Sequence, residues 1–355
     1  ACILCHDHRD KTNQWAAEYT LKWYGELQEG QTHYGEIIFA ARRRYPGARD
    51  GLLSLANDPQ TPPMVRATAL HLLPQYPFPE TLEAFSRAVY DTDPLLRMTA
   101  VQGFEMLSAE ERIPHIKHLL RDPVRVVRIR AAFLLAGAPP ASLSSQERQW
   151  LDSALEEYRQ VQHFNADHPT AHLNLGVLAS LEGDPETAEA FYRKALEMES
   201  HLAVTYINLA DLYRTQGREA EGERILRQGL ELLPEAADLH HSLGLLYARM
   251  KKTRQSLSSL NRAAELEPEN SRFGYVYGVA LNSQGRPQEA LAVLAATLEQ
   301  HPFDRDLLYA LATMNRDLDR FEEALGYASR LTEIYPNEPA YRQLEQLLRQ
   351  RLNLK

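Results

Sequence analysis

The sequence predicts an all-α protein built as a helical-repeat solenoid, with a short N-terminal segment of different character. Two periodicities predict the solenoid: one motif returns every 31 residues near the N-terminal side, and small residues return every 34 residues over the C-terminal side. The length of 355 residues agrees with this prediction, because it exceeds what a single hydrophobic core usually supports.

The N-terminal segment begins with a compact cysteine motif. Residues 1–6 read Ala-Cys-Ile-Leu-Cys-His and contain both cysteines of the chain. The spacing C-x-x-C-H is the attachment sequence of a c-type haem. Two thiols three residues apart can each form a thioether with a porphyrin vinyl group, and the following imidazole then lies under the iron. We therefore expect Cys2 and Cys5 to hold one covalent haem c and His6 to be its proximal ligand.

The second axial ligand has two candidates. His33 follows a turn that could return it to the haem, and we take it as the candidate distal ligand. His8 is the weaker alternative, because it lies only two residues past His6. Two uses of the cysteines without haem stay open, namely a zinc site completed by His8 and His33, and free thiols or a disulfide.

Residues 1–50 also contain two expected helices. In the first, Trp15, Tyr19, Trp23 and Leu27 repeat every four residues and share one face. That face either packs on the next helix or walls the haem. The second helix is expected from Thr32 into the basic cluster 42–44.

Residues 51–137 form the first repeat region. A hydrophobic residue followed by Arg-x-x-Ala recurs with its arginines at Arg66, Arg97 and Arg128, and Asp-Pro precedes the last two. Each unit is predicted to be a helix, a break at proline and a second helix. This pattern resembles short HEAT repeats, which implies that the recurring arginine bridges adjacent units.

Residues 138–145 are expected to be a linker, and residues 146–338 a second array. Its period of 34 residues is that of the tetratricopeptide repeat (TPR). Small residues stand where the two helices of a unit cross, and four of the five units end in proline; the small residues are Gly176, Ala210, Gly244, Gly278 and Ala312. A half unit precedes the five units, and residues 339–355 are expected to cap the stack.

The TPR array is predicted to present a concave groove lined by the first helix of each unit. Mixed aromatic and polar side chains there suit an extended peptide or a protein surface. The predicted groove residues are Arg214, His241, Tyr275, Asn282, Tyr309 and Arg316. A homo-oligomer, or a contact between the groove and the chain's own N-terminal region, is the alternative.

Composition excludes several other partners. The formal net charge of −9 disfavours nucleic acid and anionic lipid surfaces as partners. The sequence contains no run of about 18 apolar residues, the length that a membrane-spanning helix needs. No Ser/His/Asp set, carboxylate pair or glycine-rich phosphate loop supports hydrolytic or phosphoryl-transfer chemistry.

The motifs together resemble the C-terminal part of large multihaem c-type cytochromes that carry TPR tails. The resemblance rests on Cys2 to His6, on His6-Asp7-x-x-Asp10-Lys11 through Trp15-Ala16-Ala17, on Trp23-Tyr24-Gly25 and His33-Tyr34-Gly35, and on the two repeat regions. It implies electron transfer, further haems in sequence upstream, other haem domains or redox proteins as partners, and a periplasmic, extracellular or cell-surface location. The chain would then be a non-enzymatic electron carrier or a domain of a multihaem oxidoreductase. The alternative is a haem-free scaffold that binds a protein or peptide.

Overall fold

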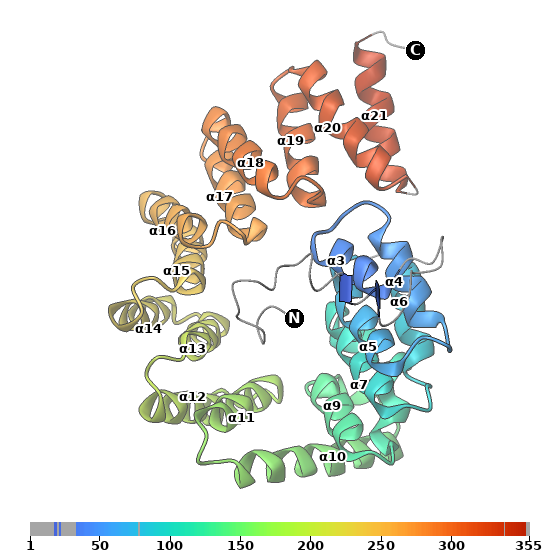
Figure 1. The fold of residues 1–355 in the computed structure, drawn as a ribbon. Coiled ribbons are helices and arrows are strands. Elements are labelled where there is room, and N and C mark those ends of the chain that lie inside the picture. Colours follow the sequence, from blue (N-terminus) through green and yellow to red (C-terminus); the bar gives the residue numbers. More distant parts are fainter. Residues whose placement is uncertain (1–17, 20, 23–32, 77–78, 337, 353–355) are drawn as a thin grey trace.

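The computed structural model describes residues 18–19, 21–22, 33–76, 79–336 and 338–352. Within these ranges the regular secondary structure is helical, and no strand is present. Successive helices pack side by side and the stack curves into a ring (Figure 1). The predicted all-α helical-repeat solenoid is therefore confirmed, whereas the predicted haem-attachment motif lies outside the described residues.

The N-terminal half of the ring consists of α3, which packs on α4, and of three helix pairs, α4 with α5, α6 with α7 and α8 with α9. Prolines stand in the first turn of α5, α6 and α7, where the missing N–H does not break a hydrogen bond. The bounds are α3 Tyr34–Arg42, α4 Ala48–Asn57, α5 Pro63–Leu72, α6 Pro79–Ala88, α7 Pro94–Gly103, α8 Ala109–Ile116 and α9 Arg125–Leu135.

The recurring arginines of this half join neighbouring units, as the sequence pattern predicted. Each guanidinium reaches a carboxylate of the following unit, in the pairs Arg66–Asp91 at 2.8 Å, Arg97–Asp122 at 2.6 Å and Arg128–Glu157 at 2.7 Å. The Arg97–Asp122 pair is bidentate. It is also buried, since the Asp122 side chain is only 3% exposed. The arginine ladder therefore sets how each unit stacks on the next.

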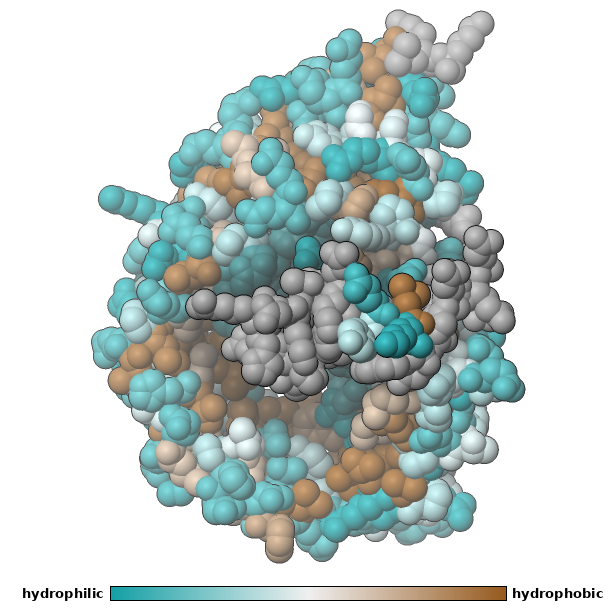
Figure 2. Space-filling model, in the orientation of Figure 1, coloured by the Kyte–Doolittle hydropathy of each residue, from teal (hydrophilic) through white to brown (hydrophobic). Residues whose placement is uncertain are grey.

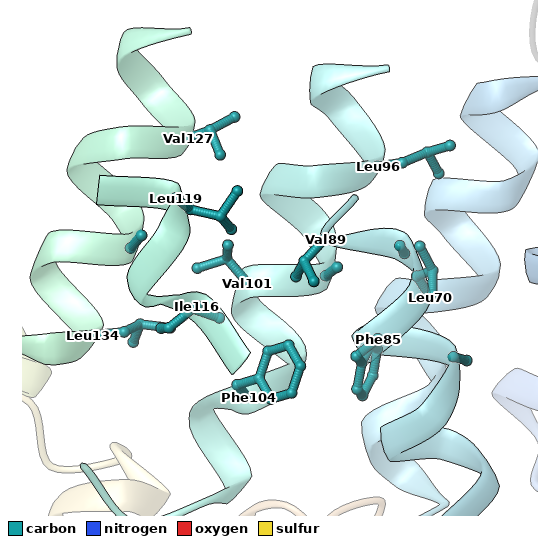
Figure 3. Close-up of a cluster of buried hydrophobic side chains, with 14 of the residues drawn as sticks. Leu70, Phe85, Val89, Leu96, Val101, Phe104, Ile116, Leu119, Val127 and Leu134 are labelled. Carbon is teal, nitrogen blue, oxygen red and sulfur yellow. The ribbon is translucent and has the colours of Figure 1, made fainter. Parts of the chain in front are cut away.

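Between the helices of this half lies a continuous apolar core. Phe85 and Phe104 lie with their ring centroids 6.0 Å apart, and both are fully buried. Figure 3 shows the side chains from α5 to α9 pointing toward one another, among them Val101, Ile116 and Leu134. Burial of this apolar surface is the main stabilising contribution to the stack.

Helix α10 (Ser145–Phe164) connects the two halves of the ring. Ser144 and Glu147 form a capping box at its start. Leu151 and Leu155 of α10, together with Leu178 of the next helix, belong to the same buried cluster as α3 to α9. Because the core and the arginine ladder both continue into α10, the two repeat regions are joined by packing and not only by the chain.

The C-terminal half consists of five helix pairs and a terminal helix. The pairs are α11 Pro169–Leu181 with α12 Pro185–Met198, α13 Ala203–Thr215 with α14 Glu219–Leu232, α15 Ala237–Arg249 with α16 Thr253–Leu266, α17 Ser271–Ser283 with α18 Pro287–Gln300, and α19 Arg305–Asp317 with α20 Phe321–Ile334. Helix α21 (Pro339–Arg351) packs on α20 and covers the end of the stack through Leu344 and Leu348.

Close helix crossings explain the small residue in the first helix of each TPR unit. A Cβ atom placed on Gly244 would lie 2.7 Å from Cγ of Leu260, and one on Gly278 would lie 2.6 Å from Cγ of Leu294. In both cases the leucine lies in the second helix of the same unit. The 34-residue period of small residues is therefore a packing requirement.

The solenoid closes on itself. Figure 1 shows the turn between α3 and α4 beside the C-terminal TPR unit. Arg44 in that turn forms an ion pair with Asp304 at 2.7 Å, and Tyr45 packs edge-on against Phe303 with ring centroids 5.6 Å apart. These contacts join residues about 260 positions apart and turn an open superhelix into a ring.

Candidate functional site

The first helices of the TPR units form the inner wall of the ring. In Figure 1, α11, α13, α15, α17 and α19 lie toward the centre and their partners toward the outside. Figure 2 shows a hollow in the middle of the molecule with apolar surface on its wall. We call the inward faces of these five helices the groove.

An apolar stripe runs along the groove. Its members are exposed although they are large and hydrophobic: Leu181 at 43%, Val204 at 46%, Val279 at 38% and Tyr309 at 44%. They come from α11, α13, α17 and α19, the first helices of four of the five units. Exposed large apolar side chains that gather on one face are typical of a binding surface.

Of these four residues, Tyr309 alone was among the predicted groove residues. Leu181, Val204 and Val279 lie on first helices but at different positions of the 34-residue repeat. The structure identifies them through their exposure, which the sequence pattern does not give.

Most of the predicted groove residues are accessible. Arg214, Asn282 and Tyr309 are exposed, whereas Tyr275 and Arg316 are partly buried. The charges are paired within the protein: Arg214 contacts Asp211, and Arg316 contacts Asp317 at 2.7 Å. Because these exposed pairs nearly cancel, the groove offers apolar contact and local hydrogen bonds instead of a strong field of one sign.

His241 differs from the expectation of an exposed groove position. It is 8% exposed, and its ring lies 4.9 Å from the ring of Phe273 in the next unit. Both ring nitrogens are buried without a hydrogen-bond partner. Burial lowers the pKa of His241, and the nearby Arg272 lowers it further, although Asp238 acts in the opposite direction. Packing between α15 and α17 therefore removes this side chain from the groove surface.

The predicted haem ligands are only partly within the described chain. Cys2, Cys5, His6 and His8 lie outside the described residues. His33 is described and is exposed at the start of α3, where its Nδ1 accepts a hydrogen bond of 3.0 Å from the backbone N–H of Gly35. Iron ligation through Nε2 of the neutral ring would place the proton on Nδ1 and break this cap. The haem assignments stay predictions.

The described residues contain no other site of this kind. Among them, no group of three or more His, Cys, Asp or Glu side chains is arranged to hold a metal ion. No helix within the described ranges is long and apolar enough to cross a membrane.

Family comparison supports the two repeat regions. A model of HEAT repeats matches residues 49–136. Two models of the tetratricopeptide repeat match residues 146–201, 241–304 and 283–339, and residues 179–246. The chain is a HEAT and TPR protein. The matched TPR residues include all five helices that line the groove.

Several solved structures are similar to parts of this HEAT and TPR protein. YrrB, described as a TPR protein with an unusual peptide-binding site, is 25% identical, with a TM-score of 0.40 over 53% of this chain and 97% of YrrB. Pseudomonas aeruginosa pilF is 20% identical, with a TM-score of 0.42 over 57% of this chain and 92% of pilF. The APC/C hetero-tetramer Cut9–Hcn1 is 16% identical, with a TM-score of 0.42 over 85% of this chain and 58% of that one. No curated protein is significantly similar in sequence.

Proposed function

We propose that this HEAT and TPR protein is a scaffold that holds an extended peptide segment of a partner protein in the groove. The observation that carries the proposal is the apolar stripe of Leu181, Val204, Val279 and Tyr309, which is exposed on the inner wall of the ring. Single exposed apolar residues are ordinary on a protein surface, so the proposal rests on four of them lying on the first helices of the units, which form the inner wall.

The chemistry of the groove favours a peptide with apolar side chains and few charges. The aromatic rings of Tyr275 and Tyr309 provide contact area at a small loss of conformational entropy, and Asn282 offers an amide to a peptide backbone. An extended chain can contact successive units in turn, because each unit repeats the same positions.

Peptide selection tests this function. Peptides selected on the wild-type protein from a random phage-displayed library are measured against Val279→Glu and Val204→Glu, each of which places a charge in the apolar stripe. We expect affinity to fall at least about tenfold, which corresponds to about 1.4 kcal/mol.

The matched control is Leu232→Glu, since Leu232 is 42% exposed on α14, the second helix of its unit. It makes the same change outside the groove and should leave affinity unchanged. Selected peptides that bind Val279→Glu and Val204→Glu as tightly as the wild type would contradict the proposal, as would an equal loss in Leu232→Glu.

A second candidate function is electron transfer through a covalent haem c, and the motif from Cys2 to His6 favours it. A thioether-bound haem would place the protein outside the bacterial cytoplasm and would make redox proteins or haem domains its partners. Protein exported from its native host should then show a Soret band and an intact mass increased by one haem. An apo mass without visible absorbance would exclude electron transfer, and the scaffold function would then be the remaining candidate. With haem present, His33→Ala should alter a six-coordinate spectrum if His33 is the distal ligand.

A further inference from the structure

The contact that closes the ring differs from the contacts between neighbouring repeats. We define the seam as Arg44 and Tyr45 on one side and Phe303 and Asp304 on the other. The buried apolar clusters on its two sides are separate: one runs from α3 to α11, and another runs from α16 to α20. The seam therefore closes by polar and aromatic contact, without a shared core.

The two sides of the seam carry opposite charge across open space. A cavity of about 760 Å³ lies between them. Its basic wall is Arg42, Arg43 and Arg44, and its acidic wall includes Glu267 and Glu269. Tyr45 and Tyr335 both line a second cavity of about 220 Å³. The ion pair therefore lies beside open space, where salt weakens electrostatic attraction.

Each side of the seam is complete without the other. Asp304 is 7% exposed and caps α19, accepting hydrogen bonds from the N–H groups of Asp306 and Leu307 and from Ser271 Oγ at 2.7 Å. Its carboxylate keeps these donors if Arg44 withdraws. These hydrogen bonds, and the water that reaches Asp304 once the seam opens, lower the cost of breaking the ion pair.

The turn that carries Arg44 has an uncommon backbone conformation. The backbone φ of Arg44 is 55°, in the left-handed region that side-chain-bearing residues seldom occupy. The Arg44 side chain is 44% exposed, so water can solvate its guanidinium in both the closed and the open ring. In a repeat stack each unit contacts mainly its neighbours, and small rotations between units add up to a large displacement of the ends.

We propose that the seam is a gate: the ring opens and closes at Arg44–Asp304 and thereby controls access of the partner to the groove. The control of access rests on the proposed function of the groove, whereas opening itself does not. In the closed ring the first helices of the TPR units face the centre of the molecule (Figure 1).

Small-angle X-ray scattering of the full chain without ligand tests the gate. Arg44→Gly removes the guanidinium and suits the left-handed backbone, so the turn should keep its shape. We expect Arg44→Gly to have a larger radius of gyration and maximum dimension than the wild type. The wild type should expand likewise near 1 M salt, where the Debye length is about 3 Å.

Two variants serve as controls. Arg44→Lys keeps the charge and should keep the ring closed, and Arg286→Ala removes an exposed ion pair with Glu289, away from the seam, and should scatter like the wild type. Circular dichroism reports whether each variant is folded. A folded Arg44→Gly that scatters like the wild type would overturn the gate, whatever the outcome of the peptide measurements. A gate that opens while no peptide binds would refute only the proposed function.

Discussion

At the scale of single residues, His241 shows how neighbouring side chains decide whether a repeat position is available for binding. Equivalent positions in the next two units carry Tyr275 and Tyr309, which remain at least partly accessible. His241 is covered because Phe273 of the next unit packs against its ring. The buried imidazole has no partner for either nitrogen, which is an unfavourable arrangement for a polar group.

Burial of His241 makes stability depend on pH. Its pKa in the folded protein lies below the value of the unfolded chain, so the unfolded state binds the proton first as pH falls below about 6.5. Stability is therefore lost as pH falls from the unfolded pKa toward the folded one. We expect His241→Leu to lose less stability than the wild type between about pH 7.5 and 5.5, measured by urea unfolding.

The control for this measurement is His201→Gln, because the His201 side chain is 61% exposed. It should show the same dependence on pH as the wild type. Part of the dependence should persist in His241→Leu, since burial also lowers the pKa of His118. Parallel curves for His241→Leu and the wild type would show that His241 does not contribute.

At the scale of elements, each helix pair depends on a close crossing that the sequence marks with a small residue. Gly244 in α15 faces Leu260 in α16, and Ser256 Oγ of α16 donates a hydrogen bond of 2.9 Å to the carbonyl oxygen of Gly244. The 34-residue period of small residues therefore marks contacts between the two helices of a unit. These contacts could be predicted from the sequence because both helices belong to the same repeat.

Enlarging Gly244 should destabilise the protein by overpacking. In Gly244→Val the new side chain would collide with Leu260, and we expect a loss of about 1 to 3 kcal/mol in the free energy of unfolding. The matched control is Gly326→Ala in α20, where an added Cβ meets nothing within 4 Å. That change should raise stability by about 0.5 to 1 kcal/mol through helix propensity. Urea unfolding measures both, and equal stability of Gly244→Val and the wild type would refute the crossing requirement.

At the scale of the whole molecule, the two repeat families form one continuous stack. The arginine ladder passes from Arg128 in α9 to Glu157 in α10, and Phe133 packs on Tyr158 with ring centroids 5.1 Å apart. Trp150 of α10 also lies under the guanidinium of Arg121, 4.7 Å from the ring centroid. The region 138–145, expected as a linker, thus separates two segments that share a core.

Truncation should reveal this shared core. A fragment of residues 33–166 retains α10, whereas residues 33–143 leave the surface that Leu151 and Leu155 cover exposed. We expect the longer fragment to be monomeric with a cooperative melting transition and the shorter one to melt lower or aggregate, because its apolar face is open. Circular dichroism and size-exclusion chromatography provide the measurement. Equal melting temperatures would show that α10 does not stabilise the first half.

The sequence by itself determined the repeat architecture and the crossing residues, because in a solenoid most stabilising contacts lie between segments close in the chain. It also placed Arg214, Asn282 and Tyr309 on an accessible surface. Tertiary structure alone decided the burial of His241, which depends on packing between units, and the continuity of the core through α10. It also decided the closure of the ring by Arg44 and Asp304: that contact follows from rotations summed over the whole stack, and no local pattern of residues contains their sum.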